Sequence, residues 1–129
     1  MNNRPIKFRV WDTKYNRWLE NGSSLHCYSN WQIDPFTGEV TDFVGSIAGS
    51  GEQFVKSDPS DNYIVQQFTG LLDSAGKEIY EGDIIVDSTG VSTVYFQNGC
   101  FWVDDMWLYD YNRTSKVIGN IFENSNLLK

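Results

Sequence analysis

Residues 71–86 read LLDSAGKEIYEGDIIV, and this stretch decides the fold. Ser74-Ala75-Gly76 separates two short runs of strand-forming residues, which predicts a tight hairpin between residues 71–73 and 77–79. Glu81-Gly82-Asp83 predicts a second turn that leads directly into a strand over residues 84–86. Short strands joined by such close turns indicate antiparallel β-structure rather than helices.

The same pattern continues toward the C-terminus. Strands are predicted over residues 91–96 and 100–103, joined by the Asn-Gly turn signal at residues 98–99. Further strands are predicted over residues 107–111 and 116–118, and a helical turn after Gly119. About five strands with short hairpins favour a small closed barrel of the SH3 type over residues 63–129.

The first half of the chain is less distinctive but also β-rich. Ile6, Phe8 and Val10 alternate with polar or larger residues, which predicts a strand with one apolar face. Strands are also expected over residues 17–20, 25–33, 39–44 and 53–56, with a Pro-Gly turn at 34–38. Residues 57–62 form the best linker candidate. We therefore predict an all-β protein of two small packed β subdomains, residues 1–62 and the SH3-like barrel at residues 63–129.

Several residues of the second half are typical of turns and core rather than of chemistry. The glycines at 70, 76, 82 and 119 stand at predicted turns, where a positive φ is often needed. Asp73 and Asp83 flank turns, where a short carboxylate can accept hydrogen bonds from nearby backbone N–H groups. The predicted core comprises Ile79, Ile84, Val86, Ile118 and Ile121.

Composition limits the classes of partner. The 129 residues carry 17 acidic and 10 basic side chains, for a net charge of -7. This sign disfavours general nucleic-acid binding, although basic residues cluster at Arg4, Lys7 and Arg9. No apolar run approaches the roughly 20 residues that span a membrane, and the N-terminus lacks a signal-peptide pattern. We expect a cytoplasmic protein that does not bind membranes.

Three segments resemble the YopX-like family of phage and prophage proteins: residues 4–12, RPIKFRVWD; residues 65–84, VQQFTGLLDSAGKEIYEGDI; and residues 117–124, VIGNIFEN, followed by Leu127-Leu128. Their order and spacing match the family, and the middle match is the most specific. The resemblance implies a phage or prophage origin, and so a location in the cytoplasm of a bacterial host cell, an all-β fold with an SH3-like C-terminal part, and self-assembly. It implies no established activity and no catalytic residues.

Catalytic and metal-binding patterns are weak. His26 and Cys27 are adjacent and point to opposite faces of a strand, so they cannot pair, and Cys100 is distant in sequence. Both cysteines are expected to be free, buried thiols. Neither residues 58–62 nor the group Asp104, Asp105 and Asp110 has the spacing of a calcium loop. We expect no metal, no cofactor and no catalytic residues.

Aromatic residues of the second half are the best binding candidates. The candidate site consists of Tyr80, Trp102, Asp104, Asp105, Trp107, Tyr109 and Tyr111. Such mixed aromatic and acidic surfaces can hold proline-rich or basic peptides. In a strand, Trp107, Tyr109 and Tyr111 would share one face. The alternative is that these rings fill a small core or an oligomer interface.

Three hypotheses follow. The leading one is a non-catalytic phage or prophage accessory protein that binds itself, as a homo-oligomer, or a host or phage protein. The second is an SH3-like module associated with nucleic acid or nucleoprotein, and the third is a small enzyme of unknown type.

Overall fold

The computed structural model describes residues 5–19, 22–23, 27–46, 53–56 and 62–128. The described elements are almost entirely strands, which confirms the predicted all-β class. The chain divides into two compact units, Met1–Arg9 with Gln66–Lys129 and, separately, Val10–Val65. Strands β1 (Phe8–Asp12) and β7 (Tyr63–Leu72) each run from one unit into the other. The predicted division into subdomains at residue 62 stays a prediction, and residues 57–61 of the predicted linker lie outside the described residues.

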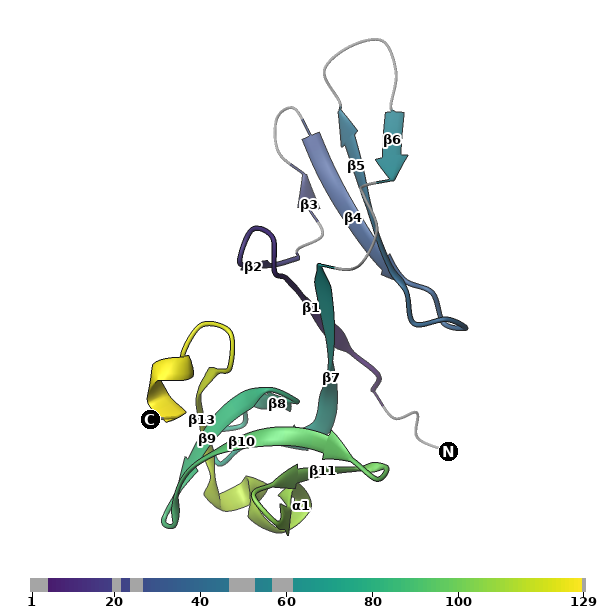
Figure 1. Cartoon of the computed structure of the whole chain (residues 1–129). Coiled ribbons are helices and arrows are strands. Elements are labelled where there is room, and N and C mark those ends of the chain that lie inside the picture. The colour runs from purple at the N-terminus through teal and green to yellow at the C-terminus, as the bar shows by residue number, and fades with distance from the viewer. Residues whose placement is uncertain (1–4, 20–21, 24–26, 47–52, 57–61, 129) are drawn as a thin grey trace. The chain divides into compact units, whose positions relative to one another are not determined.

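Two four-stranded sheets include the strands of the first half (Figure 1). One has the order β2-β1-β7-β8 and the other the order β3-β4-β5-β6. The remaining strands of these sheets are β2 (Arg17–Trp18), β3 (Gly22–Ser23), β4 (Cys27–Ile33), β5 (Val40–Ser46), β6 (Gln53–Lys56) and β8 (Glu78–Tyr80). The predicted turn between β4 and β5 is confirmed, with Gly38 at a φ of 75°.

Strand β1 is buried at its end rather than along one face. Val10, Trp11 and Asp12 are all buried, whereas Ile6 and Phe8 are exposed, so the predicted apolar face is wrong for those two residues. Both faces of the strand are covered at its end, because the adjacent residues Val10 and Trp11 point to opposite faces and are both buried. Trp11 packs edge-on against Trp18 with ring centroids 4.9 Å apart. Burial therefore follows position along the strand and not the period-two pattern.

The second half forms a curled five-stranded antiparallel sheet in the order β12-β11-β10-β9-β13 (Figure 1). Its strands are β9 (Asp83–Asp87), β10 (Gly90–Gln97), β11 (Cys100–Val103), β12 (Met106–Trp107) and β13 (Lys116–Asn120). Helix α1 (Leu108–Tyr111) and the 3-10 turn Asn112–Thr114 connect β12 to β13, and the 3-10 turn Ser125–Leu128 follows. Asn98 and Gly99 have φ values of 53° and 78°, as the predicted Asn-Gly hairpin requires. Closure of the sheet as an SH3-type barrel stays a prediction.

The core of this unit consists of Ile79, Ile85, Val94, Val103, Leu108 and Val117. Ile79 and Ile84 are buried as predicted, but Ile118 is exposed, which corrects its place in the predicted core. The pairing of β13 with β9 shifts register between Val117 and Gly119. Adjacent strand residues point to opposite faces, so with Val117 turned inward Ile118 faces outward.

Gly119 also differs from expectation. Its backbone is not in the left-handed region, unlike Gly76 and Gly82, whose φ values are 82° and 83°. Instead, a Cβ atom at Gly119 would lie 2.5 Å from the side-chain oxygen of Asn124. Close approach of a side chain, rather than backbone conformation, explains glycine at this position.

The carboxylate of Asp73 links the β7–β8 hairpin to β13 through hydrogen bonds. Its Oδ1 accepts hydrogen bonds from the N–H groups of Ala75 at 2.8 Å and Lys77 at 2.9 Å, and its Oδ2 accepts one from the N–H of Val117 at 2.9 Å. Burial of Asp73 opposes ionisation, but these N–H groups, with the charge of Lys77, hold its pKa below the ordinary value. The predicted role of this carboxylate at the turn is confirmed, and the bond to Val117 extends it to a distant strand.

Asp73→Ala should lower the free energy of unfolding by about 2–4 kcal/mol at neutral pH, because three backbone donors lose a charged acceptor. The lowered pKa means that the contribution of Asp73 is present above its unfolded value of 3.8 and is lost as the pH falls through the folded value. The gap between wild type and variant, measured by chemical denaturation, should therefore shrink in acid. Asp110→Ala, at an exposed position, is the control. Equal stabilities of the two variants at neutral pH would contradict this role.

Candidate functional site

Two tryptophans of the predicted site stand side by side on neighbouring strands. Trp102 of β11 is directly opposite Trp107 of β12, and their ring centroids lie 6.3 Å apart at an interplanar angle of 62°. The indole N–H of Trp102 donates a hydrogen bond to the carbonyl oxygen of Gln97 at 2.8 Å, which fixes this ring. Trp107 is 56% exposed. The pair is therefore a preformed aromatic surface rather than part of the core.

The predicted strand over residues 107–111 is wrong beyond Trp107. Residues 108–111 form the single turn α1, in which positions three apart face the same side. Leu108 is fully buried, and Tyr111 packs against the core cluster. Tyr109 points outward and is 61% exposed. Trp107, Tyr109 and Tyr111 consequently do not share one face, and Tyr111 belongs to the core.

Asp104 and Asp105 form the tight turn between β11 and β12, and both side chains are exposed. The Asp104 backbone is left-handed, with a φ of 50°. Its Oδ2 accepts a hydrogen bond from the Ser92 hydroxyl at 2.8 Å, and its carbonyl oxygen accepts one from the Tyr95 hydroxyl. These contacts hold the acidic turn at the end of the tryptophan pair.

We call Trp102, Asp104, Asp105, Trp107 and Tyr109 the aromatic–acidic surface. One of its rings already holds a cation, because the guanidinium carbon of Arg113 lies 5.4 Å from the centroid of the Tyr109 ring. A guanidinium N–H of Arg113 also donates a long hydrogen bond of 3.4 Å to the Tyr109 hydroxyl. The face of Tyr109 is thus accessible to a guanidinium group.

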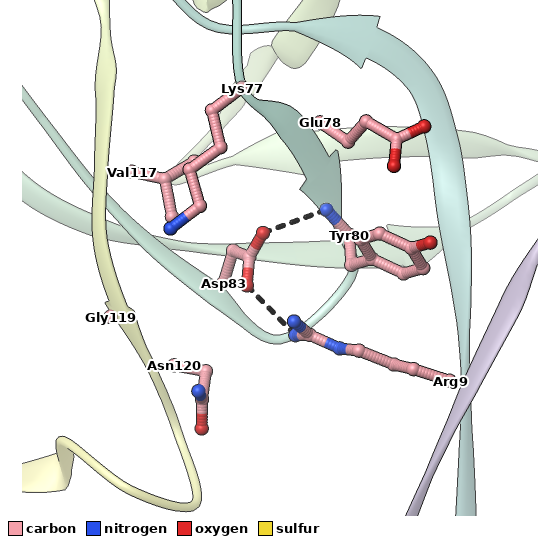
Figure 2. Close-up of a pocket in the computed structure, with 8 residues that line it drawn as sticks. All are labelled: Arg9, Lys77, Glu78, Tyr80, Asp83, Val117, Gly119 and Asn120. Atoms are coloured by element: carbon pink, nitrogen blue, oxygen red, sulfur yellow. Dashed lines mark hydrogen bonds and ion pairs between the residues drawn. The ribbon is translucent and has the colours of Figure 1, made fainter. Parts of the chain in front are cut away.

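Tyr80 lies in a different place, beside a pocket of about 260 Å³ (Figure 2). The pocket lies between the start of β1, the β8–β9 region and β13. It is lined by Arg9, Lys77, Glu78, Tyr80, Asp83, Val117, Gly119 and Asn120. The structure therefore places Tyr80 away from the other predicted site residues, none of which lines this pocket.

Asp83 is the central group of this pocket. A guanidinium N–H of Arg9 donates to Asp83 Oδ1 at 2.8 Å, and the backbone N–H of Tyr80 donates to Oδ2 at 2.8 Å. Arg9 also lies over the Tyr80 ring, 4.8 Å from its centroid. Burial raises the pKa of Asp83, while the Tyr80 N–H, Arg9 and Lys77 act in the opposite direction without cancelling it.

Arg9 is itself held by the strands around it. Its Nε–H donates to Gln66 Oε1 at 2.9 Å, and an N–H of its guanidinium donates to the carbonyl oxygen of Glu81 at 3.2 Å. Gln66 in turn packs against Gly82 so closely that a Cβ there would lie 2.0 Å from the amide nitrogen. The sequence alone does not indicate this role of Arg9, because its only signal there is a place among the basic residues Arg4, Lys7 and Arg9.

The charged groups of the pocket largely neutralise each other. Arg9 pairs with Asp83, and Lys7 pairs with Glu78 at 2.5 Å. The first pair joins β1 to β9, and the second joins the residue before β1 to β8. We interpret the residues of this pocket as stabilising the contacts between strands. The aromatic–acidic surface is the better candidate for binding a partner.

The other sequence candidates contribute little. Cys100 is exposed at the end of the β10–β11 hairpin, so its predicted burial is wrong, because this end of the hairpin extends past the core. His26 and the side chain of Cys27 lie outside the described residues. Within the described ranges, no three His, Cys, Asp or Glu side chains gather as metal ligands would. No helix in that part of the chain has the length and apolar character to cross a membrane.

Replacing Arg9 by methionine should lower the free energy of unfolding by about 3–5 kcal/mol at neutral pH, because Asp83 would keep a buried charge without its partner. The raised pKa of Asp83 means that the native chain holds this proton more tightly than the unfolded chain, whose value is 3.8. The contribution of Asp83 is therefore most favourable below 3.8 and is lost as the pH rises through the folded value. The deficit of Arg9→Met should accordingly shrink in acid, as measured by chemical denaturation.

Arg17→Met is the matched control, because the exposed Arg17 lies 3.7 Å from Asp12, which also accepts backbone hydrogen bonds from Lys14 and Tyr15. We expect this control to cost less than about 1 kcal/mol. Equal losses in the two variants at neutral pH would show that Asp83 does not depend on Arg9.

Comparison with known proteins agrees with the fold. The family model described as YopX protein matches residues 7–129. Protein EF1440 from Enterococcus faecalis, known from a crystal structure, shares 26% identity over 98% of this chain and 100% of that chain, with a TM-score of 0.64. Protein yopX from Bacillus subtilis, also a crystal structure, has 22% identity, covers 95% of this chain and 97% of its own, and gives a TM-score of 0.55, which shows the same fold. A search among curated proteins found no match. Because the family match extends from β1 to the end of the chain, this protein belongs to the YopX family, as the resemblance predicted.

Proposed function

We propose that this chain is a non-catalytic accessory protein of a phage or prophage, which binds a cationic segment of another protein through the aromatic–acidic surface. The observation that carries the proposal is the exposed Trp107 ring, paired with Trp102 and placed beside two exposed carboxylates. Tryptophan and tyrosine at a surface combine large contact area with low loss of side-chain freedom on binding. The phage or prophage origin rests on the family resemblance.

The charges of the surface favour a basic partner. Asp104 accepts a hydrogen bond from the Ser92 hydroxyl rather than from a cation, and Asp105 is exposed next to it. A guanidinium group could stack on Trp107 while it pairs with these carboxylates. Arg113 on Tyr109 is an example of such stacking inside the chain itself.

The alternatives fit this surface less well. Self-association through the same rings would bring two acidic turns together, at a cost in repulsion between chains of net charge -7. A nucleic-acid backbone would meet the same carboxylates with its phosphates. An enzyme would need reactive groups, but the described pocket uses Asp83 and Glu78 in ion pairs. A basic protein segment is therefore the partner that we favour.

Trp107→Ala should weaken binding of a short peptide of alternating arginine and glycine by about 10-fold, because the main stacking surface is lost. Tyr109→Ala should weaken binding less, and added salt should weaken wild-type binding. Tyr15→Ala is the matched control, because Tyr15 is 62% exposed and Tyr109 61%, and each ring carries an arginine. Fluorescence polarisation of the labelled peptide measures the affinities of the three variants and the effect of salt on wild-type binding. Equal effects of the Tyr15 and Trp107 variants, or no binding by wild type, would contradict the proposal.

Removal of Arg113 gives a sharper test, because it should strengthen binding. Arg113 occupies the face of Tyr109, so Arg113→Ala makes that ring available to an arginine of the peptide. We expect binding about 2- to 5-fold tighter than that of Lys116→Ala, the value of one exposed cation–π contact. Lys116 is exposed and its loss changes the net charge equally, which controls for the general electrostatic effect. Equal affinities of the two variants would show that Tyr109 does not contact the peptide.

A further inference from the structure

The hairpin of β4 and β5 presents one aromatic side chain at its tip. Phe36 is 95% exposed, the most exposed of the large hydrophobic side chains that the structure describes. It stands in the turn Asp34-Pro35-Phe36-Thr37-Gly38, whose flanking residues Ile33 and Val40 are paired across the hairpin. The ring therefore extends from the end of a regular two-stranded element.

Several hydrogen bonds within the turn fix the backbone around Phe36. Asp34 Oδ1 accepts hydrogen bonds from the N–H groups of Phe36 at 2.7 Å and Thr37 at 3.2 Å. The N–H of Gly38 donates to the carbonyl oxygen of Asp34 at 2.8 Å, and the N–H of Asp34 donates to that of Glu39 at 2.9 Å. The Thr37 hydroxyl accepts a further bond from the N–H of Glu39 at 3.2 Å. The position of the Phe36 backbone is thus fixed before any contact with a partner.

The turn itself does not require phenylalanine at position 36. Asp34 supplies the side-chain acceptor, Pro35 has a fixed φ, and Gly38 takes the left-handed conformation with a φ of 75°. Position 36 contributes only a backbone N–H, which any residue other than proline would provide. A single exposed apolar residue is common, but a fully exposed ring on a rigid turn has the form of an interface anchor.

We propose that Phe36 inserts into an apolar pocket of a second protein, and that basic side chains around that pocket pair with the exposed Asp34 and Glu39. A rigid turn lowers the entropy that is lost when such a ring is buried. The pocket described above is lined by Arg9, Lys77, Glu78 and Asp83, and this charged lining does not suit a phenyl ring. Two chains of net charge -7 would also repel each other, and the acidic residues beside Phe36 match a basic surface, so we take a different protein as the partner. This inference is independent of the aromatic–acidic surface.

Photo-crosslinking of the full chain tests the proposal. Phe36 is replaced by the photoreactive analogue p-benzoylphenylalanine, and the chain is irradiated in a lysate of its host cells. We expect one discrete heterologous adduct, which excess wild-type chain suppresses at least about 10-fold better than excess Phe36→Ala chain. Mass spectrometry should place the crosslink in an apolar pocket bordered by lysine or arginine. The same analogue at Tyr15, another exposed ring in this unit, should not give that adduct.

Several results would overturn the proposal. They are the absence of an adduct, equal suppression by wild type and Phe36→Ala, an adduct between two copies of this chain, and an adduct only with lipid. Because Phe36 makes no side-chain packing contact that the fold needs, Phe36→Ala should keep the unfolding midpoint of wild type. A changed midpoint would contradict the premise that the ring is free for a partner.

Discussion

Asp83 carries a charge in a position almost closed to water, and the arrangement of the surrounding strands depends on satisfying it. An isolated buried carboxylate would be costly, so the chain supplies a guanidinium from Arg9 and a backbone N–H from Tyr80. Gln66 holds Arg9 in place, and Gly82 leaves the space that Gln66 needs. Asp73 plays the same part at the other end of β8, where its carboxylate reaches Val117 of β13. The buried carboxylates of Asp73 and Asp83 thus connect residues 73–83 to β13 and to β1, respectively.

The interactions of Asp83 and Asp73 bear on where a partner can bind. The charges that line the pocket are engaged in ion pairs between strands. The aromatic–acidic surface and the tip of the β4–β5 hairpin, by contrast, are among the places where large apolar side chains are exposed to water. Binding residues are commonly carried by turns and edges of a rigid scaffold. Trp107, Tyr109 and Phe36 all stand at such positions.

Local rules explain what the sequence could predict. The hairpins at residues 74–76 and 98–99 follow from glycine and asparagine at positions that need positive φ, and the turn role of Asp73 follows from its short carboxylate. The strand predicted over residues 107–111 failed because Trp-Leu-Tyr-Asp-Tyr fits both an alternating strand and one helical turn. Tertiary packing decided between them by burying Leu108 and Tyr111. Arg9 and Asp83 lie far apart in sequence, and no local pattern indicates that they pair.

The central claim is that partner binding uses the aromatic–acidic surface and not the Arg9–Asp83 pocket. Nitrogen–proton NMR correlation spectra of the chain, titrated with the arginine–glycine peptide, test it most directly. The account predicts that chemical shifts change most for residues 102–113, including the indole N–H groups of Trp102 and Trp107, and little for Tyr80 and Asp83. Changes centred on Arg9, Tyr80 and Asp83, or the absence of any change at saturating peptide, would contradict it.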